Sequence, residues 1–135
     1  MAFINQHSCI VTDSYGNIYN FLWNGDDIEY IFFDKSLGKA EKKQVASNCL
    51  SEFDVSIDKG DTIFLTCQKK DGVIMLLSCN NGIWEEEVLA NNISKKIFNL
   101  NIVIKDFINI FFNEPIDESG KKYSLNHYYK SSGNW

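Results

Sequence analysis

The chain has 135 residues, 44% of them hydrophobic and 23% charged, a balance that indicates one folded domain and excludes a disordered chain. The net charge is −5 and all 13 basic residues are lysine, so no arginine guanidinium can form bidentate hydrogen bonds with phosphate. Nucleic acid is therefore not an expected partner. The apolar runs are too short to cross a membrane, and the first residues lack the features of a signal peptide.

The first 50 residues contain four short runs separated by turn residues, which is the pattern of β-strands. Asn24-Gly25 lies between two of them and is a strong hairpin signal, because both central positions of such a turn need a positive φ. Lys39–Leu50 has helix propensity, but its place in the order of the runs favours a strand. The strands expected here are 7–12, 17–23, 28–33 and 40–46.

The rest of the chain continues this pattern. Asp71-Gly72 marks another tight hairpin, and a longer loop at 113–122 replaces it in the last part of the chain. The middle runs are apolar on both faces, as in strands that pack between two layers, whereas the outer runs are charged. The strands expected here are 53–57, 62–68, 73–79, 83–89, 98–103, 107–113 and 123–129.

The runs repeat with a period of about 45 residues. Ile18, Ile63 and Ile108 are separated by 45 and 45 positions, and each of them opens an apolar run. Four short antiparallel strands per repeat at this period are typical of the blade of a β-propeller. The regular period argues against the main alternative, a sandwich of two sheets with eleven strands.

We therefore expect an all-β protein, a β-propeller-type repeat of three four-stranded antiparallel blades. The last blade lacks its outer strand. Trp135 takes the first position of that strand, so we expect either a cut inside a blade or a strand supplied from elsewhere, for which 1–5 is a candidate. The blades are expected at about 6–50, 51–95 and 96–135.

Two of the units, "SIDKGDTIFLTCQKKDGVIMLLSCNNGIWEEEVL" and "NLNIVIKDFINIFFNEPIDESGKKYSLNHYYKSSGNW", carry a recurring pattern. An apolar strand opens with isoleucine, a hairpin follows, and a later turn leads to Gly-x-Trp. The pattern resembles blades of uncharacterised bacterial β-propeller repeat proteins from low-GC Gram-positive bacteria. The resemblance implies the fold and says little about activity, since neither a Trp-Asp dipeptide at blade ends nor a sialidase-type Asp box is present.

Three blades do not close a propeller, which typically has about four to eight. Open outer blades leave apolar faces without a partner. We therefore expect the partner to be a second copy of the chain, which gives a homodimer with six blades, or missing blades of a longer chain.

The cysteines show no CxxC spacing and no cluster with histidine, so neither a zinc site nor another cofactor is expected. With a turn centred on Asp71-Gly72, Cys67 would face Leu76. Free thiols and the lack of a signal peptide favour the cytoplasm. The residues expected to be buried free thiols are Cys9, Cys49, Cys67 and Cys79.

Asp13 and Asp58 occupy matched positions, each five residues before the isoleucine of its repeat. Repeated carboxylates could bind a cation or a sugar hydroxyl. The favoured interpretation is a turn cap, in which each carboxylate bonds to its own backbone. Val103 at the third matched position weakens a ring of ligands.

"WNGDDIEY" combines an indole, two carboxylates and a tyrosine around one turn. Aromatic faces with nearby acceptors are what sugar recognition uses, so Trp23, Asp26, Asp27 and Tyr30 are candidate ligand-binding residues. The alternative is a hairpin whose aromatic residues belong to the core.

His127 and Tyr129 complete the candidate set, although no partner of a catalytic histidine is identifiable in the sequence. No nucleophile with its base and no carboxylate pair can be assigned. The sequence therefore favours a non-enzymatic binding module that is carbohydrate-binding. The alternative is a fragment of a propeller-fold glycoside hydrolase or lyase whose catalytic residues lie outside this chain.

Overall fold

The computed structural model describes residues 8–117, 119 and 121–130 and contains eleven strands and no helix among them. The first sheet consists of β1 (Ser8–Thr12), β2 (Ile18–Trp23), β3 (Ile28–Asp34) and β4 (Lys39–Ala46). The second sheet consists of β5 (Cys49–Ile57), β6 (Ile63–Lys69), β7 (Ile74–Asn80) and β8 (Ile83–Ala90). The third sheet consists of β9 (Phe98–Ile104), β10 (Ile108–Pro115) and β11 (Tyr123–Lys130).

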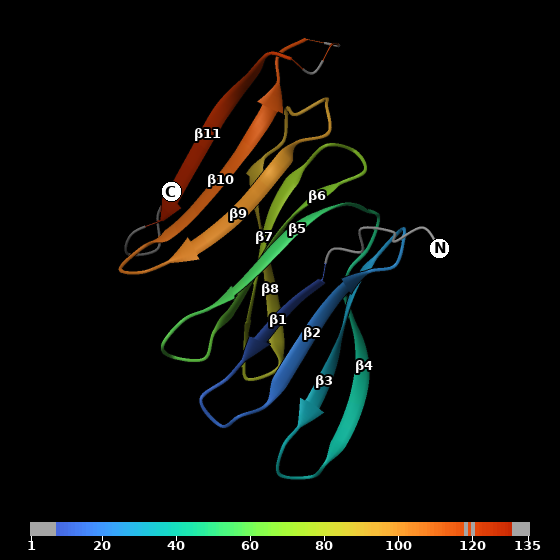
Figure 1. The fold of residues 1–135 in the computed structure, drawn as a ribbon, viewed down its shortest axis with the longest axis vertical. Coiled ribbons are helices and arrows are strands. Elements are labelled where there is room, and N and C mark those ends of the chain that lie inside the picture. The colour runs from blue at the N-terminus through green and yellow to red at the C-terminus, as the bar shows by residue number, and fades with distance from the viewer. Residues whose placement is uncertain (1–7, 118, 120, 131–135) are drawn as a thin grey trace.

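Each sheet is an antiparallel meander in which neighbouring strands follow one another along the chain. The three sheets are stacked, and the first strands of each, β1, β5 and β9, lie next to one another (Figure 1). The prediction of an all-β chain with antiparallel sheets is confirmed. The described residues form three sheets and not the two of a sandwich. Trp135 and 1–5, where a missing strand was considered, lie outside the described residues.

Two hydrophobic cores hold the stack together. The core between the first and second sheets is rich in aromatic residues, with Phe21 and Phe53 both completely buried. The core between the second and third sheets is mainly aliphatic, and Phe112 is its completely buried aromatic residue. The middle strands of the second sheet contribute side chains to both cores, as their apolar sequence on both faces indicates.

The strand positions agree with those expected from the sequence to within a few residues. Lys39–Leu50 contains strand β4 and no helix. Strand β5 begins at Cys49, earlier than the expected start at 53, because an irregularity after Cys49 lets the strand pair with β6 over a longer stretch.

The predicted register of the β6–β7 hairpin is wrong by one residue. Cys67 pairs with Met75 and not with Leu76, because the turn contains one residue more than a two-residue turn centred on Asp71-Gly72. None of the four cysteines forms a disulfide; Cys49, Cys67 and Cys79 are buried as expected, whereas Cys9 is only half-buried.

The carboxylate of Asp54 joins the first strands of all three sheets. Its Oδ2 accepts a hydrogen bond from the backbone N–H of Ile102 on β9 at 2.9 Å. Its Oδ1 lies 3.6 Å from the donating thiol of Cys9 on β1. Burial, and then the negative charge of Asp54, raise the pKa of the Cys9 thiol from 9.0 to about 12. The thiol therefore stays protonated and remains a donor.

Replacing Asp54 with asparagine is expected to lower the pKa of Cys9, because the neighbouring negative charge is lost. The pKa should stay above 9.0, since burial is the larger cause of its rise. At one alkaline pH, Cys9 of the variant should react faster with iodoacetamide, as measured by peptide mass spectrometry. Cys79, whose pKa is raised by burial, is the internal control. An unchanged rate at Cys9 would contradict the contact.

Gly72 is required where the β6–β7 turn meets the connection to the third sheet. Its φ is 95°, and a Cβ at this position would lie 1.8 Å from the carbonyl oxygen of Ile93. Gly25 has a similar φ of 104°, but nothing lies within 4 Å of a Cβ added there. Substitutions at these two glycines therefore distinguish the cost of backbone strain from the cost of a steric clash.

Gly72→Ala is expected to lower the free energy of unfolding by about 3 kcal/mol, because positive φ and overpacking both contribute. Gly25→Ala should cost only about 1 kcal/mol, since it adds the strain without the clash. Urea denaturation of both variants measures the difference. Equal losses would show that the connection moves aside without cost.

Candidate ligand-binding site

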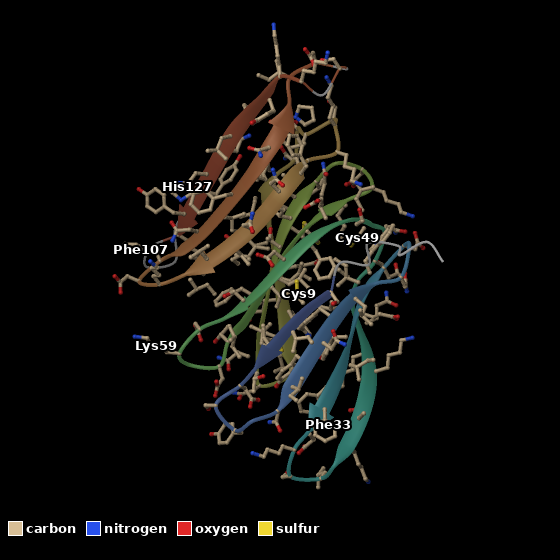
Figure 2. All side chains as sticks on the ribbon, viewed as in Figure 1. Cys9, Phe33, Cys49, Lys59, Phe107 and His127 are labelled. Atoms are coloured by element: carbon tan, nitrogen blue, oxygen red, sulfur yellow. The ribbon has the colours of Figure 1, made fainter. Side chains whose placement is uncertain are left out.

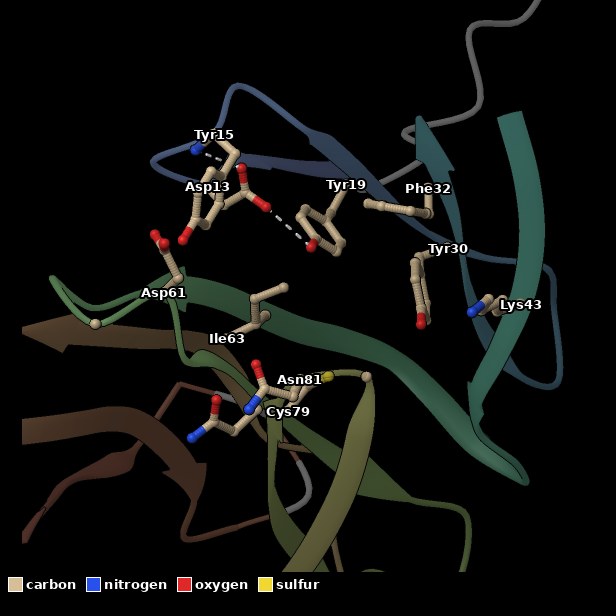
Figure 3. A pocket seen from close by; sticks show the side chains of 13 residues that line it. Asp13, Tyr15, Tyr19, Tyr30, Phe32, Lys43, Asp61, Ile63, Cys79 and Asn81 are labelled. Carbon is tan, nitrogen blue, oxygen red and sulfur yellow. Dashed lines mark hydrogen bonds between the residues drawn. The ribbon is translucent and has the colours of Figure 1, made fainter. Parts of the chain in front are cut away.

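An open cleft of about 460 Å³ lies between the first and second sheets at the end where the β1–β2, β5–β6 and β7–β8 turns come together (Figure 3). Four aromatic residues line it, and polar groups from the turns surround them. The aromatic residues are Tyr15, Tyr19, Tyr30 and Phe32. The polar side chains are Asp13, Lys43, Asp61, Asn80 and Asn81. We call this the inter-sheet cleft.

Asp13 shapes the turn that carries Tyr15 into the cleft. Its Oδ1 accepts hydrogen bonds from the backbone N–H groups of Tyr15 at 3.0 Å and Asn17 at 2.9 Å. Its Oδ2 accepts bonds from the Asn17 amide at 3.0 Å and from the Tyr19 hydroxyl at 3.2 Å. The turn-cap interpretation of Asp13 therefore agrees with the geometry, and the same carboxylate also borders the cleft.

The matched turn of the second sheet is built in the same way. Asp58 Oδ1 accepts hydrogen bonds from the N–H groups of Gly60 and Thr62, both at 2.9 Å. Gly16 in the first turn and Asp61 in the second are 45 positions apart, and both have positive φ, of 84° and 65°. The repeated sequence thus produces two turns of the same shape.

The two turns are tied to each other across the sheets. Asp61 Oδ1 accepts a hydrogen bond from the backbone N–H of Ser14 at 2.9 Å, and its Oδ2 accepts one from the Ser14 hydroxyl. The tie fixes one end of the inter-sheet cleft. Tyr15, next in the chain, is 79% exposed and stands beside this tie with its ring open to solvent (Figure 3).

Tyr19 and Tyr30 form the inner wall of the cleft. Burial, followed by the negative charge of Asp13, raises the pKa of Tyr19 above its ordinary value, so its hydroxyl remains a donor at neutral pH. Tyr30 is only 5% exposed, and its hydroxyl accepts a hydrogen bond from the indole of Trp84 at 3.4 Å. The ring centroids of Tyr19 and Phe32 lie 4.9 Å apart. The wall is therefore preformed by packing within the protein.

Three of the sequence-predicted site residues lie elsewhere. Trp23 donates its indole N–H to the carbonyl oxygen of Cys49 at 3.0 Å, which ties the first sheet to the start of the second. Asp26 forms an ion pair with Lys70, and Asp27 accepts the backbone N–H of Asn48 at 3.1 Å. These residues join the two sheets at the opposite end of β2 from the inter-sheet cleft.

Asp58 borders a smaller hollow of about 390 Å³ between the second and third sheets. His127 and Tyr129 lie on β11 in the third sheet and line neither hollow. Figure 2 shows His127 on this sheet. The His127 ring stacks on Phe111 with centroids 4.3 Å apart, and its Nε2 lies 3.0 Å from Asn109 Oδ1. Of the predicted residues, the structure therefore brings only Asp13 and Tyr30 together in the inter-sheet cleft.

Sequence reasoning missed most of the cleft, including Tyr15, Tyr19, Phe32 and Asp61. The repeat contained a usable signal. Residues 13–17 and 58–62 are matched turns, and stacking of equal units brings matched turns to the same end. The contribution of the β7–β8 turn, with Asn80 and Asn81, needs the three-dimensional arrangement.

Within the described ranges, no group of three or more His, Cys, Asp or Glu side chains could hold a metal ion. Nor does the described chain include a helix of the length and apolarity that a membrane crossing needs. Comparison of the chain with protein families, with curated proteins and with solved structures finds no match in any of the three. The geometry of the inter-sheet cleft is therefore the basis for a function.

Proposed function

We propose that the three sheets are blades of a β-propeller-type repeat and that the chain is a non-enzymatic module that binds carbohydrate in the inter-sheet cleft. One observation carries the proposal. An exposed tyrosine ring, an inner aromatic wall and carboxylate and amide groups from separate turns line one open cleft of about 460 Å³. Sugar rings present apolar C–H faces and hydroxyl edges, so they need this combination of surfaces.

Tyr15 is the residue best placed to stack on a sugar ring, because its side chain is 79% exposed and borders the cleft. Across the cleft, Asn80 and Asn81 are exposed and provide both donors and acceptors for hydroxyl groups. Lys43 is the only described cation among the lining residues, which also include the carboxylates of Asp13 and Asp61. This balance of charge favours a neutral glycan over an acidic one.

The two carboxylates of the cleft support binding over hydrolysis. A glycosidase needs one carboxyl group that gives a proton and a second that attacks or activates water. Asp13 already accepts four hydrogen bonds, and Asp61 accepts two from Ser14. Both act as acceptors that fix the turns, which suits a rigid binding site.

Tyr15→Ala is expected to weaken binding of a glycan about tenfold, which corresponds to about 1.4 kcal/mol and is the size of one stacking contact. A glycan array identifies the ligand, and isothermal titration calorimetry with that glycan measures the loss. Phe107→Ala is the matched control, because Phe107 is 49% exposed in the β9–β10 turn and does not line the cleft.

Two results would contradict the proposal. The first is an array without a ligand whose binding depends on Tyr15. The second is turnover of glycosides by the purified chain, which would replace a binding module with an enzyme.

A further inference from the structure

We propose that two copies of this chain associate head to tail, with the outer face of the third sheet of one copy packed on the outer face of the first sheet of the other. The outer face of the first sheet carries Ile10, Ile18, Leu22, Ile31 and Phe33. The outer face of the third sheet carries Phe111, Asn113, Leu125, His127 and Tyr129. This inference does not depend on the ligand of the inter-sheet cleft.

The repeat shows which neighbour each face is built for. Ile63 is 2% exposed because it packs toward the first sheet, and Ile108 packs toward the second. Ile18 occupies the same position in the first sheet, points away from the second sheet and is 40% exposed. By this equivalence, the outer face of the first sheet matches the faces that pack against a preceding sheet.

The neighbouring strand repeats the contrast. Ile31 pairs with Asn20 as Leu77 pairs with Leu65 in the second sheet. Leu77 is 2% exposed, whereas Ile31 is 37% exposed. Both positions carry large apolar side chains, as a covered face does. The described residues place a neighbouring sheet over Leu77 and none over Ile31.

The outer face of the third sheet also carries an exposed apolar residue at a position that is buried in the other two sheets. Leu125 pairs with Asn113, as Ile28 pairs with Trp23 and as Ile74 pairs with Gln68. Ile28 and Ile74 are completely buried beneath the following sheet, whereas Leu125 is 70% exposed. This face therefore matches those that pack against a following sheet.

Asn113 on the same face occupies a position that, in the other two sheets, binds the backbone at the start of the following unit. Trp23, Gln68 and Asn113 are each 45 positions apart. Trp23 donates to the carbonyl oxygen of Cys49, where the second unit begins. Gln68 donates to the carbonyl oxygen of Lys95 and accepts the N–H of Ile97, where the third unit begins. Asn113 places an amide, 9% exposed, at the position that binds the start of a following unit.

The polar groups of the first sheet's outer face fit a covered surface. Asn20 Oδ1 is buried and lacks a hydrogen-bond donor among the described residues. The outer face of the third sheet contains the Asn113 amide, which can supply one. Lys42 and Glu29 on the first sheet's face lie 3.1 Å apart, so covering them leaves no lone charge.

These equivalences identify a second copy as the occupant. The outer face of the first sheet matches a face that packs on a preceding sheet, and the outer face of the third sheet matches one that packs on a following sheet. The two faces therefore complement each other, and because they differ, the contact is head to tail. Two copies joined by two such contacts form a ring of six sheets with twofold symmetry. Six lies within the range of about four to eight blades found in closed propellers.

Light scattering at micromolar concentration is expected to give a mass twice the 15.5 kDa of one chain. Ile31→Lys and Leu125→Glu should each give 15.5 kDa, because every junction then contains one altered face. An equal mixture of the two variants should recover the doubled mass, since one junction joins two unchanged faces and the other pairs opposite charges.

Ile83→Lys is the control and should keep the doubled mass, because Ile83 is 69% exposed on the second sheet, which has no outer face in the stack. Circular dichroism and urea midpoints establish that each variant is folded. A monomeric natural chain overturns the proposal. A dimer that persists in Ile31→Lys but is lost in Leu125→Glu also overturns it, because the third sheets would then pair with each other.

Discussion

The period of 45 residues is the constraint on which the contacts between the sheets depend. Several hydrogen bonds between neighbouring sheets join residues of nearly this separation: 45 for Cys9 and Asp54, 47 for Ser14 and Asp61, and 48 for Asp54 and Ile102. Because each unit has nearly the same length up to its central hairpin, a side chain at one repeat position meets the same part of the neighbouring sheet each time. The inter-sheet cleft exists because two matched turns meet in this way.

The same geometry accepts different chemistry at matched positions. An indole at Trp23 and an amide at Gln68 both hold the start of the following unit, although one bonds once and the other bonds as donor and acceptor. The first core contains several aromatic residues, whereas the second is largely aliphatic. Cores tolerate such exchanges when the volume and the pattern of apolar positions are kept. The side chains at a junction can therefore change without a change of architecture.

The strands could be predicted because their signals are local: apolar runs, turn residues and the repeat of Ile18, Ile63 and Ile108. Register was less predictable, since one extra residue in the β6–β7 turn moves Cys67 opposite Met75. The candidate site was predicted least well, because its residues come from three turns and several strands of two sheets. Composition around one turn pointed to Trp23 and its neighbours, whose polar groups hold the sheets together.

The central position of the second sheet has a consequence for the way the molecule opens. Its middle strands are covered on both faces, whereas in the first and third sheets the described neighbour covers one face only, and β4 is exposed along most of its length. Backbone amides of β6 and β7 should therefore exchange their hydrogens only on global unfolding, and those of the flanking sheets through smaller openings. A ligand in the inter-sheet cleft would then slow exchange in the first sheet while leaving the third unchanged.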